Sequence, residues 1–358
     1  MKLCTIVGAR PQFIKAATVS RIVKSTSDIK EIIIHTGQHY DANMSEQFFE
    51  ELDIPKPSYN LNIGSGLHGK QTGLMLAAIE DVLLNEKPDW VLVYGDTNST
   101  LAGALAAAKL HIPIAHVEAG LRSFNRKMPE EINRVTTDHL STLLFPPTQN
   151  GYQQLIKEGI SEKDIFNVGD VMYDATLYYN EFNANRKTIV DDLALKPKSY
   201  CLATIHRAEN TDCPQRLNNI CTALIELSTV TNIIVPLHPR TRSVLEKQGL
   251  LKSLVDHIQL IEPVGYLDML ALEENAATII TDSGGVQKEA YFNQVPCITL
   301  RDETEWVELI DAGWNRLCSP DKPFSLIDFI PLENPSRLNS SGLYGHGNAA
   351  ERIIKLLC

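Results

Sequence analysis

The sequence predicts an α/β protein built from two doubly wound units, each a parallel sheet with helices on both faces. First, its 358 residues exceed what one hydrophobic core holds and suit two domains. Second, short apolar runs alternate with amphipathic helical stretches along most of the chain, which is typical of βαβ units. Third, this alternation stops in the polar stretch 180–198 and then starts again. We therefore expect two units of similar size, facing each other across a cleft.

The first unit is expected over residues 1–170. Its strands are short apolar runs, predicted at residues 2–8, 31–35, 90–94, 112–117 and 142–145. Its helices show helical spacing of apolar residues, and they are predicted at residues 14–23, at 68–86, in an alanine-rich stretch ending near Leu110, and from Pro129 onward.

The second unit is expected over residues 171–347. Its strands are predicted at residues 200–205, 232–236, 257–261, 278–281 and 296–300. Its helices are predicted at residues 172–179, 215–227, 241–248, 266–274 and 285–292. Residues 319–346 are rich in Pro, Ser, Gly and Asn and predict a loop, and a last helix follows at 349–357.

Composition excludes several classes of function. A net charge of -11 argues against a general binder of nucleic acid or anionic membranes, although a local basic pocket can still hold an anionic small ligand. We find neither a signal-peptide pattern at the N-terminus nor an apolar run approaching 18 residues. The seven scattered cysteines lack C-x-x-C spacing, which favours reduced thiols and no metal site. We expect a cytoplasmic protein.

Carboxylates follow two predicted strands of the first unit. Asp96 ends the strand at 90–94, Glu118 ends the next strand, and Glu130 and Glu131 open the helix at Pro129. This is where α/β proteins place their chemistry. The alternatives are structural: Asp96 as a helix N-cap, and Glu130 as a helix-dipole partner that pairs with Arg134 at i,i+4.

Glycines and cations suggest an anion site. Residues 282–289 (DSGGVQKE) follow a buried strand and open a helix, where two glycines let backbone N–H groups approach a phosphate. The alternative is a serine N-cap with a glycine turn. Cations or histidines end other strands, at Arg10, Lys15, His206, Arg207, His238 and Arg240. For Arg10 and Lys15 the alternative is that both are solvated surface cations.

Together these groups fit a nucleotide sugar held across the cleft. The cations and the helix N-terminus suit a diphosphate on the second unit, and the carboxylates would face the sugar. Departure of the anomeric diphosphate builds positive charge at C1, which acidifies C2–H. Nearby carboxylates can stabilise that charge and move the C2 proton.

Eight ordered blocks carry a resemblance to a known family. They are GARPQFIK (8–15), TGQH (36–39), GDTNST (95–100), HVEAGLR (116–122), PEEINR (129–134), HRAEN (206–210), TDSGGVQKEA (281–290) and RDETEW (301–306). On these motifs the chain resembles the non-hydrolysing UDP-N-acetylglucosamine 2-epimerases over essentially its whole length.

The resemblance implies a GT-B-like fold whose last helix, at 348–358, crosses back to the first domain, and a homodimer without metal or redox cofactor. It implies inversion at C2 through elimination of UDP to a glycal and re-addition. The implied catalytic residues are Asp96, Glu118, Glu130 and His206. The implied contacts to UDP and substrate are Arg10, Lys15, Gln38, His39, Arg134, Arg207, His238, Arg240, Ser283, Gly284, Gly285 and Glu289.

Departures from the family pattern concern the substrate. Trp306 replaces an Arg, the loop 122–128 is short, and Leu74 and Asp41 replace residues of a regulatory second site. The variant pattern is similar to the branch that acts on UDP-2,3-diacetamido-2,3-dideoxyglucuronic acid for surface polysaccharide, with Arg126 and Lys127 as candidate partners of its carboxylate. The alternatives are UDP-N-acetylglucosamine as substrate, a GT-B glycosyltransferase, a hydrolysing epimerase, or a nucleotide-sugar sensor without catalysis.

Overall fold

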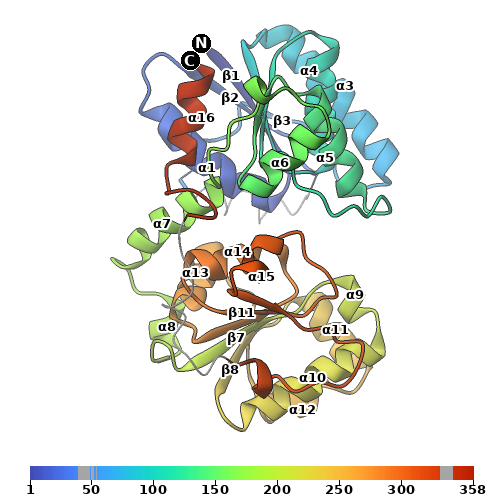
Figure 1. Cartoon of the computed structure of the whole chain (residues 1–358), viewed down its shortest axis with the longest axis vertical. Coiled ribbons are helices and arrows are strands. Elements are labelled where there is room, and N and C mark those ends of the chain that lie inside the picture. The colour runs from blue at the N-terminus through green and yellow to red at the C-terminus, as the bar shows by residue number, and fades with distance from the viewer. Residues whose placement is uncertain (39–48, 50–51, 54, 331–341) are drawn as a thin grey trace. The chain divides into compact units, whose positions relative to one another are not determined.

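The computed structural model describes residues 1–38, 49, 52–53, 55–330 and 342–358. It divides into two compact units (Figure 1). The first comprises Met1–Ala175 together with Gly342–Cys358, and the second comprises Thr176–Ser341. Each unit is described by itself below.

The first unit is built on a parallel sheet of six strands. The strands are β1 (Lys2–Val7), β2 (Lys30–His35), β3 (Tyr59–Asn60), β4 (Trp90–Tyr94), β5 (Ile114–Val117) and β6 (Leu143–Phe145). They lie in the order β3-β2-β1-β4-β5-β6, which is the doubly wound order of dinucleotide-binding folds. The central strands are buried along most of their length, because helices cover both faces of the sheet.

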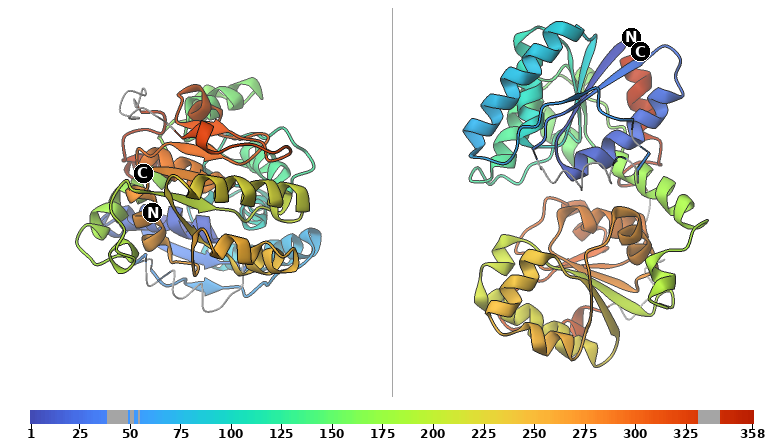
Figure 2. Two further views of the ribbon diagram at one scale, coloured as in Figure 1. Left: turned by 90° about the horizontal axis from the view of Figure 1, so that it is seen from below. Right: turned by 180° about the vertical axis from the view of Figure 1, so that it is seen from behind.

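Two groups of helices flank this sheet (Figures 1 and 2). The helices are α1 (Arg10–Lys24), α3 (His68–Glu86), α4 (Asn98–Lys109), α5 (Pro129–Leu140), α6 (Gln149–Lys157) and α16 (Ala349–Leu357). Helix α1 packs against α16, whereas α3 packs on α4 and α4 packs on α5. A short 3₁₀ turn, η1 (Glu162–Asp164), follows α6.

The C-terminal segment is fixed to the first unit where two glycines cross. Gly169 and Gly345 have φ values of 94° and 86°, and a Cβ on Gly345 would lie 2.9 Å from the Cα of Gly169. Only residues without a side chain allow this approach. Beside the crossing, Asp174 of α7 (Val171–Asn183) accepts a hydrogen bond from the N–H of Ala350 at 2.8 Å. Helix α16 therefore begins on a carboxylate supplied by α7.

The second unit repeats the same topology. Its strands are β7 (Tyr200–Thr204), β8 (Asn232–Pro236), β9 (Gln259–Ile261), β10 (Thr278–Thr281), β11 (Cys297–Thr299) and β12 (Asn315–Leu317). The order β12-β11-β10-β7-β8-β9 is all parallel and, read from the other edge, matches the first sheet strand for strand. Its helices are α8 (Ile189–Asp192), α9 (Ala208–Thr211), α10 (Pro214–Ser228), α11 (Pro239–Lys247), α12 (Leu251–Val255), α13 (Tyr266–Asn275), α14 (Gly284–Phe292) and α15 (Val307–Asp311), with the 3₁₀ turn η2 (Ile327–Phe329).

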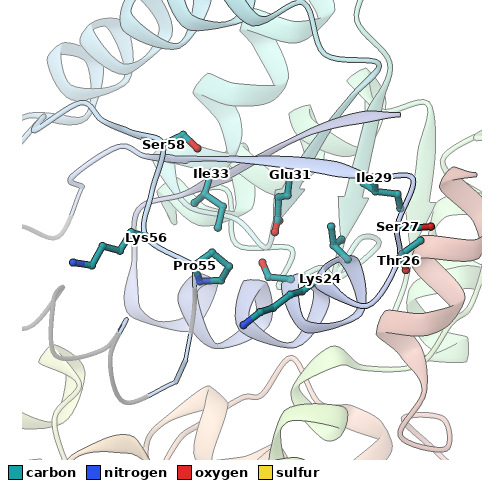
Figure 3. A pocket seen from close by; sticks show the side chains of 11 residues that line it. Lys24, Thr26, Ser27, Ile29, Glu31, Ile33, Pro55, Lys56 and Ser58 are labelled. Atoms are coloured by element: carbon teal, nitrogen blue, oxygen red, sulfur yellow. The ribbon is translucent and has the colours of Figure 1, made fainter.

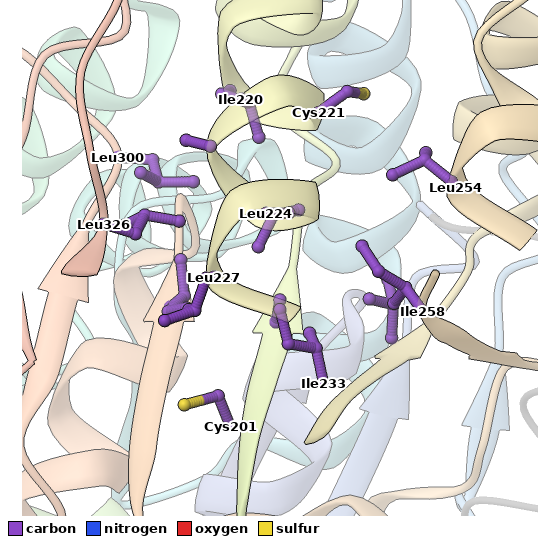
Figure 4. Packing of buried hydrophobic residues seen from close by; sticks show 14 of the residues in the cluster. Cys201, Ile220, Cys221, Leu224, Leu227, Ile233, Leu254, Ile258, Leu300 and Leu326 are labelled. Atoms are coloured by element: carbon purple, nitrogen blue, oxygen red, sulfur yellow. The ribbon is translucent and has the colours of Figure 1, made fainter. Parts of the chain in front are cut away.

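The core of the second unit forms where α10 lies on the sheet (Figure 4). Ile220, Leu224 and Leu227 recur at helical spacing and are at most 2% exposed. They pack with Cys201 and Cys221, which are free thiols. Burial raises the pKa of Cys221 to about 12, so this thiol stays protonated and serves as a small apolar side chain.

The predicted doubly wound units are confirmed, with differences at element ends. Helix α1 begins at Arg10 and has Pro11 in its first turn, as predicted. Strands β3 and β12 and helices α6, α8, α9, α12 and α15 were not predicted. All of these except the nine-residue α6 have two to five residues, which is too few to show a period. Within the described ranges, every helix is too short or too polar to cross a bilayer.

Candidate active site

Asp96 and Glu118 lie at neighbouring ends of adjacent strands in the first unit. Strands β4 and β5 pair in parallel with Tyr94 opposite Val117, so the residues that follow them emerge at the same edge of the sheet. A Cβ built on Gly95 would lie 3.4 Å from Lys15 Nζ and 3.9 Å from Glu118 Oε1. The polar cluster predicted at this edge is therefore present.

Lys15 belongs to the carboxylate cluster. Its Nζ lies 2.7 Å from Glu118 Oε2, and the two side chains are only 7% and 13% exposed. The alternative of a solvated surface cation is therefore wrong for Lys15. The lysine gives any bound sugar a cation next to the acid.

Asp96 is held by two residues of α5 and does not cap helix α4. Thr97 is the N-cap, and its hydroxyl accepts from the N–H of Thr100. The carboxylate of Asp96 pairs with Arg134, and its carbonyl accepts from Asn133 Nδ2 at 2.9 Å. Burial raises the pKa of Asp96, and Arg134 offsets part of that rise. A carboxyl group whose pKa is raised in this way suits proton transfer near neutral pH.

Glu118 occupies a left-handed backbone conformation with φ of 70°. This region is unfavourable for residues with a Cβ and costs about 1–3 kcal/mol when the surroundings enforce it. The N–H of Glu118 bonds the carbonyl of Phe145 at 3.1 Å, which fixes the turn after β5 against β6. Strain of this kind clusters at functional sites.

Glu131 and Glu130 have different environments although they are neighbours. Glu131 is buried and accepts from the N–H groups of Ser123 and Phe124, both at 2.9 Å, and from Arg134 at 3.2 Å. It therefore anchors the loop before α5. Glu130 is exposed in the first turn of α5, without an ion-pair partner in the part of the chain that the structure describes. The alternative in which Glu130 pairs with Arg134 at i,i+4 is wrong, because Arg134 pairs with Glu131 and Asp96.

The loop 122–128 divides into a buried and an exposed part. Arg122 is buried and pairs with Asp138 at 2.7 Å and with Glu158 at 2.6 Å, so it is part of the scaffold. Arg126 and Lys127 are exposed. The two cations predicted to meet a sugar carboxylate are thus open to solvent on a loop that Glu131 anchors.

In the second unit, Asp282 organises the ends of β7 and β10. Its buried carboxylate accepts from the backbone N–H groups of His206 at 3.1 Å and Arg207 at 3.0 Å, and from Asn210 Nδ2 at 3.0 Å. His206 Nδ1 lies 3.5 Å from Asp282 Oδ1, with its side chain half exposed. Burial lowers the pKa of His206, and Asp282 opposes this shift. Asp282 thereby fixes the backbone that carries the predicted histidine.

Helix α14 begins at the predicted glycine pair. Ser283 is its N-cap and accepts from the N–H of Val286, so the structural alternative for Ser283 is correct, while both glycines remain in the first turn. A Cβ on Gly284 would meet Glu305 Oε1 at 2.6 Å, whereas one on Gly285 has no neighbour nearer than 3.9 Å. Glu289 is 7% exposed, one and a half turns into the helix. The free N–H groups of this first turn can bind an anion.

Two predicted phosphate contacts have other partners in the structure. His238 caps α11, and its Nδ1 accepts from the N–H of Arg240 at 3.2 Å. Arg240 is exposed and makes two 2.8 Å contacts with the carboxylate of Asp212. Exposed ion pairs of this kind are weak and exchange readily with a ligand anion.

The remaining predicted contacts lie near the carboxyl ends of β1 and β2. Arg10 is the first residue of α1 and is partly buried. Gln38 Oε1 accepts from both the N–H and the hydroxyl of Ser99, at 2.9 Å and 2.7 Å, so it links β2 to helix α4. His39 and Asp41 lie outside the described residues.

The side chains that support the cluster were not predicted from the sequence. They are polar groups on buried faces, namely Gln12, Asn98, His116, Asn133 and Asp138. Asn133 shares the buried face of α5 with Arg134 and Asp138. Several polar residues recur on the core-facing side of the α5 sequence, where apolar residues are expected, and this pattern could have revealed these supporting side chains.

A pocket of about 360 Å³ lies elsewhere in the first unit (Figure 3). Its lining includes Ser20 and Lys24 of α1, Glu31 at the amino end of β2, and Lys56. Since the cluster lies at the carboxyl ends of β4 and β5, this pocket belongs to a different part of the unit. No group of three His, Cys, Asp or Glu side chains arranged for a metal occurs among the residues that the structure covers.

The fold and the strand-end chemistry define a two-domain nucleotide-sugar enzyme, and comparison with known proteins gives its family. The model of the UDP-N-acetylglucosamine 2-epimerase family matches residues 21–358. The chain is 56% identical to a UDP-N-acetylglucosamine 2-epimerase homolog of Methanococcus maripaludis, covering 100% of this chain and 99% of that protein. It is 53% identical to the UDP-2,3-diacetamido-2,3-dideoxy-D-glucuronate 2-epimerase of Pseudomonas aeruginosa, over 100% and 99% of the two chains.

The same family appears among solved structures. The UDP-GlcNAc 2-epimerase of Methanocaldococcus jannaschii, crystallised with UDP-GlcNAc and UDP, has a TM-score of 0.89 and 48% identity, covering 100% of this chain and 99% of that chain. The chain belongs to the UDP-N-acetylglucosamine 2-epimerase family. It is an isomerase of the UDP-sugar 2-epimerase type, with the GT-B-like pair of Rossmann-like units that the sequence predicted.

Proposed function

We propose that the enzyme inverts C2 of a UDP-sugar by eliminating UDP and adding it back. In the first step a carboxylate removes the C2 proton, its electron pair forms the C1=C2 bond, and the C1–O bond breaks as UDP leaves. In the second step a carboxylic acid returns a proton to the other face of C2, and UDP oxygen bonds again to C1. The observation that carries the proposal is the cluster of Asp96, Glu118 and Lys15 at one sheet edge.

The carboxylates Asp96, Glu118 and Glu130 are the proposed proton carriers. Asp96 has a raised pKa caused by burial, which keeps a proton available at higher pH than usual. The carboxylate of Glu118, 2.7 Å from Lys15 Nζ, can stabilise positive charge at C1. Glu130, exposed at the start of α5, can exchange its proton with solvent.

The second unit is the proposed UDP site. The first turn of α14 offers N–H groups and the helix dipole to the diphosphate, with Ser283, Gly284 and Gly285 closest to it. Glu289 is the proposed acceptor for ribose hydroxyls. The remaining proposed UDP contacts in this unit are Arg207, His238 and Arg240, and His206 is the proposed contact to the reacting sugar. The proposed contacts from the first unit are Arg10, Gln38, His39 and Arg134.

The proposed substrate is UDP-2,3-diacetamido-2,3-dideoxyglucuronic acid, which would give its manno epimer for surface polysaccharide. The relative at 53% identity carries that activity in its name. Arg126 and Lys127, exposed on the loop that Glu131 anchors, offer the cations that a sugar carboxylate needs. The second candidate is UDP-N-acetylglucosamine, supported by the 56% identical relative.

Deuterium exchange tests the proposal. The enzyme is incubated in D₂O with each of the two UDP-sugars, without acceptor, and C2 deuteration is followed by NMR. Deuterium at C2 of the diacetamido uronic acid alone is the expected result. Exchange only with UDP-N-acetylglucosamine would reverse the choice of substrate. A glycosyltransferase predicts no exchange without acceptor, and a hydrolysing epimerase predicts accumulation of free UDP.

We further propose a cytoplasmic homodimer. Helix α3 has exposed apolar side chains, Leu74 at 51% and Leu84 at 54%, beside its N-cap Leu67 at 83%. Apolar side chains gathered on one helix are typical of a surface that another chain covers. Analytical ultracentrifugation tests this assembly, since a monomer at micromolar concentration would contradict it.

A further inference from the structure

His116 and Asp138 form a fully buried pair beside the carboxylate cluster. Both side chains are 0% exposed, and His116 Nδ1 lies 2.7 Å from Asp138 Oδ1. The other ring nitrogen, Nε2, lies 2.8 Å from the carbonyl oxygen of Gly95. Because a carbonyl oxygen only accepts, Nε2 must carry the hydrogen of this bond. The imidazole therefore links helix α5 to the residue immediately before Asp96.

The second oxygen of Asp138 binds the loop after Glu118. Oδ2 accepts from the N–H of Gly120 at 3.1 Å and lies 2.7 Å from Arg122 Nη2. On its other side, Arg122 donates two hydrogen bonds to the carboxylate of Glu158, at 2.8 Å and 2.6 Å. The carboxylate of Asp138 thus contacts the imidazole of His116, the N–H of Gly120 and the guanidinium of Arg122, and both of its oxygens have hydrogen-bond partners.

The two ends of this pair reach the two loops that carry the proposed proton carriers. Gly95 precedes Asp96 directly, and Gly120 follows Glu118 by two residues. Glu118 between them has the strained φ of 70°, which persists only where neighbouring contacts enforce it. His116 on one side and Asp138 on the other supply such contacts.

We propose that His116 and Asp138 are positioning residues for proton transfer at C2, because together they set the spacing between Asp96 and Glu118. The inference rests on the proposed function, in which these two carboxylates exchange protons with the sugar. Proton transfer requires heavy atoms within hydrogen-bond reach, and a displacement of about 1 Å can lower the rate about 100-fold. A pair that only stabilises the fold would instead affect the free energy of unfolding and leave the rate per folded molecule unchanged.

A matched pair of substitutions at His116 separates the two roles. The amide N–H of Gln reaches the place of Nε2, so His116→Gln keeps the bond to the Gly95 carbonyl and loses that to Asp138. The shorter Asn reaches the place of Nδ1, so His116→Asn keeps Asp138 and leaves the carbonyl unpaired. Each substitution breaks one end of the link between α5 and Gly95, so positioning by the pair predicts that kcat falls about 100-fold in both variants. Wild-type kcat in both variants, measured per folded molecule, would overturn it.

Substitutions at Asp138 give an independent test. In Asp138→Asn the amide nitrogen can donate to His116 Nδ1, and the amide oxygen can accept from Gly120 and Arg122, so every contact has a partner. Asp138→Ala removes all three contacts. Positioning predicts that Asp138→Asn restores most of the kcat that Asp138→Ala loses. If Asp138→Ala keeps wild-type kcat while its melting temperature falls, the pair is structural only and the inference is wrong.

The readouts are kcat and KM, C2 deuterium exchange, UDP affinity by calorimetry, and melting temperature for each variant. A fall in kcat and exchange with unchanged UDP affinity is the expected signature. Glu158→Gln is the control, because it weakens the outer end of the same network and should lower only the melting temperature. If the wild-type enzyme exchanges no C2 proton with either UDP-sugar, the proposed function fails, whereas exchange that is insensitive to all four variants overturns this inference alone.

Discussion

The two units have one topology and opposite chemistry at their strand ends. Both sheets are parallel, six-stranded and ordered alike. In the first unit the ends of β4 and β5 carry carboxylates that pair with buried cations, Glu118 with Lys15 and Asp96 with Arg134. In the second, the buried Asp282 is satisfied by backbone N–H groups.

The difference lies in what each unit leaves available for a ligand. Paired carboxylates in the first unit can move protons and stabilise positive charge. In the second unit the oxygens of the central Asp282 are occupied by hydrogen bonds, and the N-terminal turn of α14, which favours negative charge, is left accessible. Under the proposed function, one fold would supply an acid–base surface and an anion-binding surface, because a few residues after each strand differ.

The largest effect should follow from Glu118→Gln in the first unit. The amide keeps the shape of the side chain but cannot take a proton, so kcat should fall about 1,000-fold. UDP affinity should stay unchanged, because Glu118 is not among the proposed UDP contacts. Steady-state kinetics and calorimetry with UDP check both statements. A parallel loss of UDP affinity would contradict the proposal that Glu118 acts in catalysis and not in UDP binding.

Glu130→Gln should lower kcat by about 100-fold, a smaller loss than at Glu118. Glu130 is exposed and unpaired among the described side chains, so this change should leave the melting temperature as it is. Differential scanning calorimetry and kinetics on the same preparation test it. Wild-type kcat would remove Glu130 from the proposed proton carriers and reduce its role to the helix dipole.

Gly284→Ala and Gly285→Ala address the anion-binding surface. An added methyl at either position opposes close approach of a phosphate, so we expect UDP affinity to fall about 10-fold in both, the worth of one good contact. Only Gly284→Ala should also lower the melting temperature, since its Cβ would lie 2.6 Å from Glu305 Oε1. Unchanged UDP affinity in Gly285→Ala, with its C2 exchange intact, would place the diphosphate elsewhere.

The sequence predicted this division better than it predicted the contacts within each unit. Alternating apolar runs indicated both sheets, and the polar residues after the strands indicated the two surfaces. The pairing of Lys15 with Glu118 joins residues far apart in the chain, so only the parallel register brings them together. Thr97 rather than Asp96 caps α4, a choice between adjacent residues that local propensity does not resolve.

Buried polar groups were the other source of error. His116 lies within an apolar strand, where histidine is usually a satisfied core residue, and nothing in its neighbours reveals that Asp138 and Gly95 are its partners. Glu130 and Glu131 are adjacent and identical in type, yet α5 turns one into the core and the other to solvent. Such assignments depend on tertiary packing.

Two carboxylates of the first unit should have opposite effects on stability as pH changes. Burial raises the pKa of Asp96, so its ionised form destabilises the fold, and Asp96→Asn should be the more stable protein above about pH 4, with the difference lost at lower pH. Burial also raises the pKa of Glu158, but hydrogen bonds from Arg122 and Gln154 outweigh it and leave the pKa lowered. Glu158→Gln should therefore be less stable than wild type at neutral pH and converge with it as pH falls below the usual glutamate range.

Urea unfolding of the three proteins between pH 3.5 and 7.5 measures these differences. Asp96→Asn should also lose catalysis, so greater stability would accompany lower activity, as expected where an ionised group is held against its desolvation. If both variants kept the wild-type pH dependence of the unfolding free energy, neither carboxylate would change its proton affinity on folding.

The smallest effect is expected from Arg240→Ala at the surface of the second unit. Arg240 is 52% exposed, and the carboxylate of Asp212 already neutralises it at 2.8 Å, so a phosphate must compete with that pair. Exposed ion pairs contribute about 0–1 kcal/mol, so UDP affinity should fall less than about fivefold, and the melting temperature should hardly change. Asp212→Ala is the matched control, because it releases Arg240 and should raise UDP affinity if the cation lies near the diphosphate. A loss beyond 100-fold in Arg240→Ala would instead make this residue a principal phosphate contact, and the anion-binding surface would then extend from α14 to the start of α11.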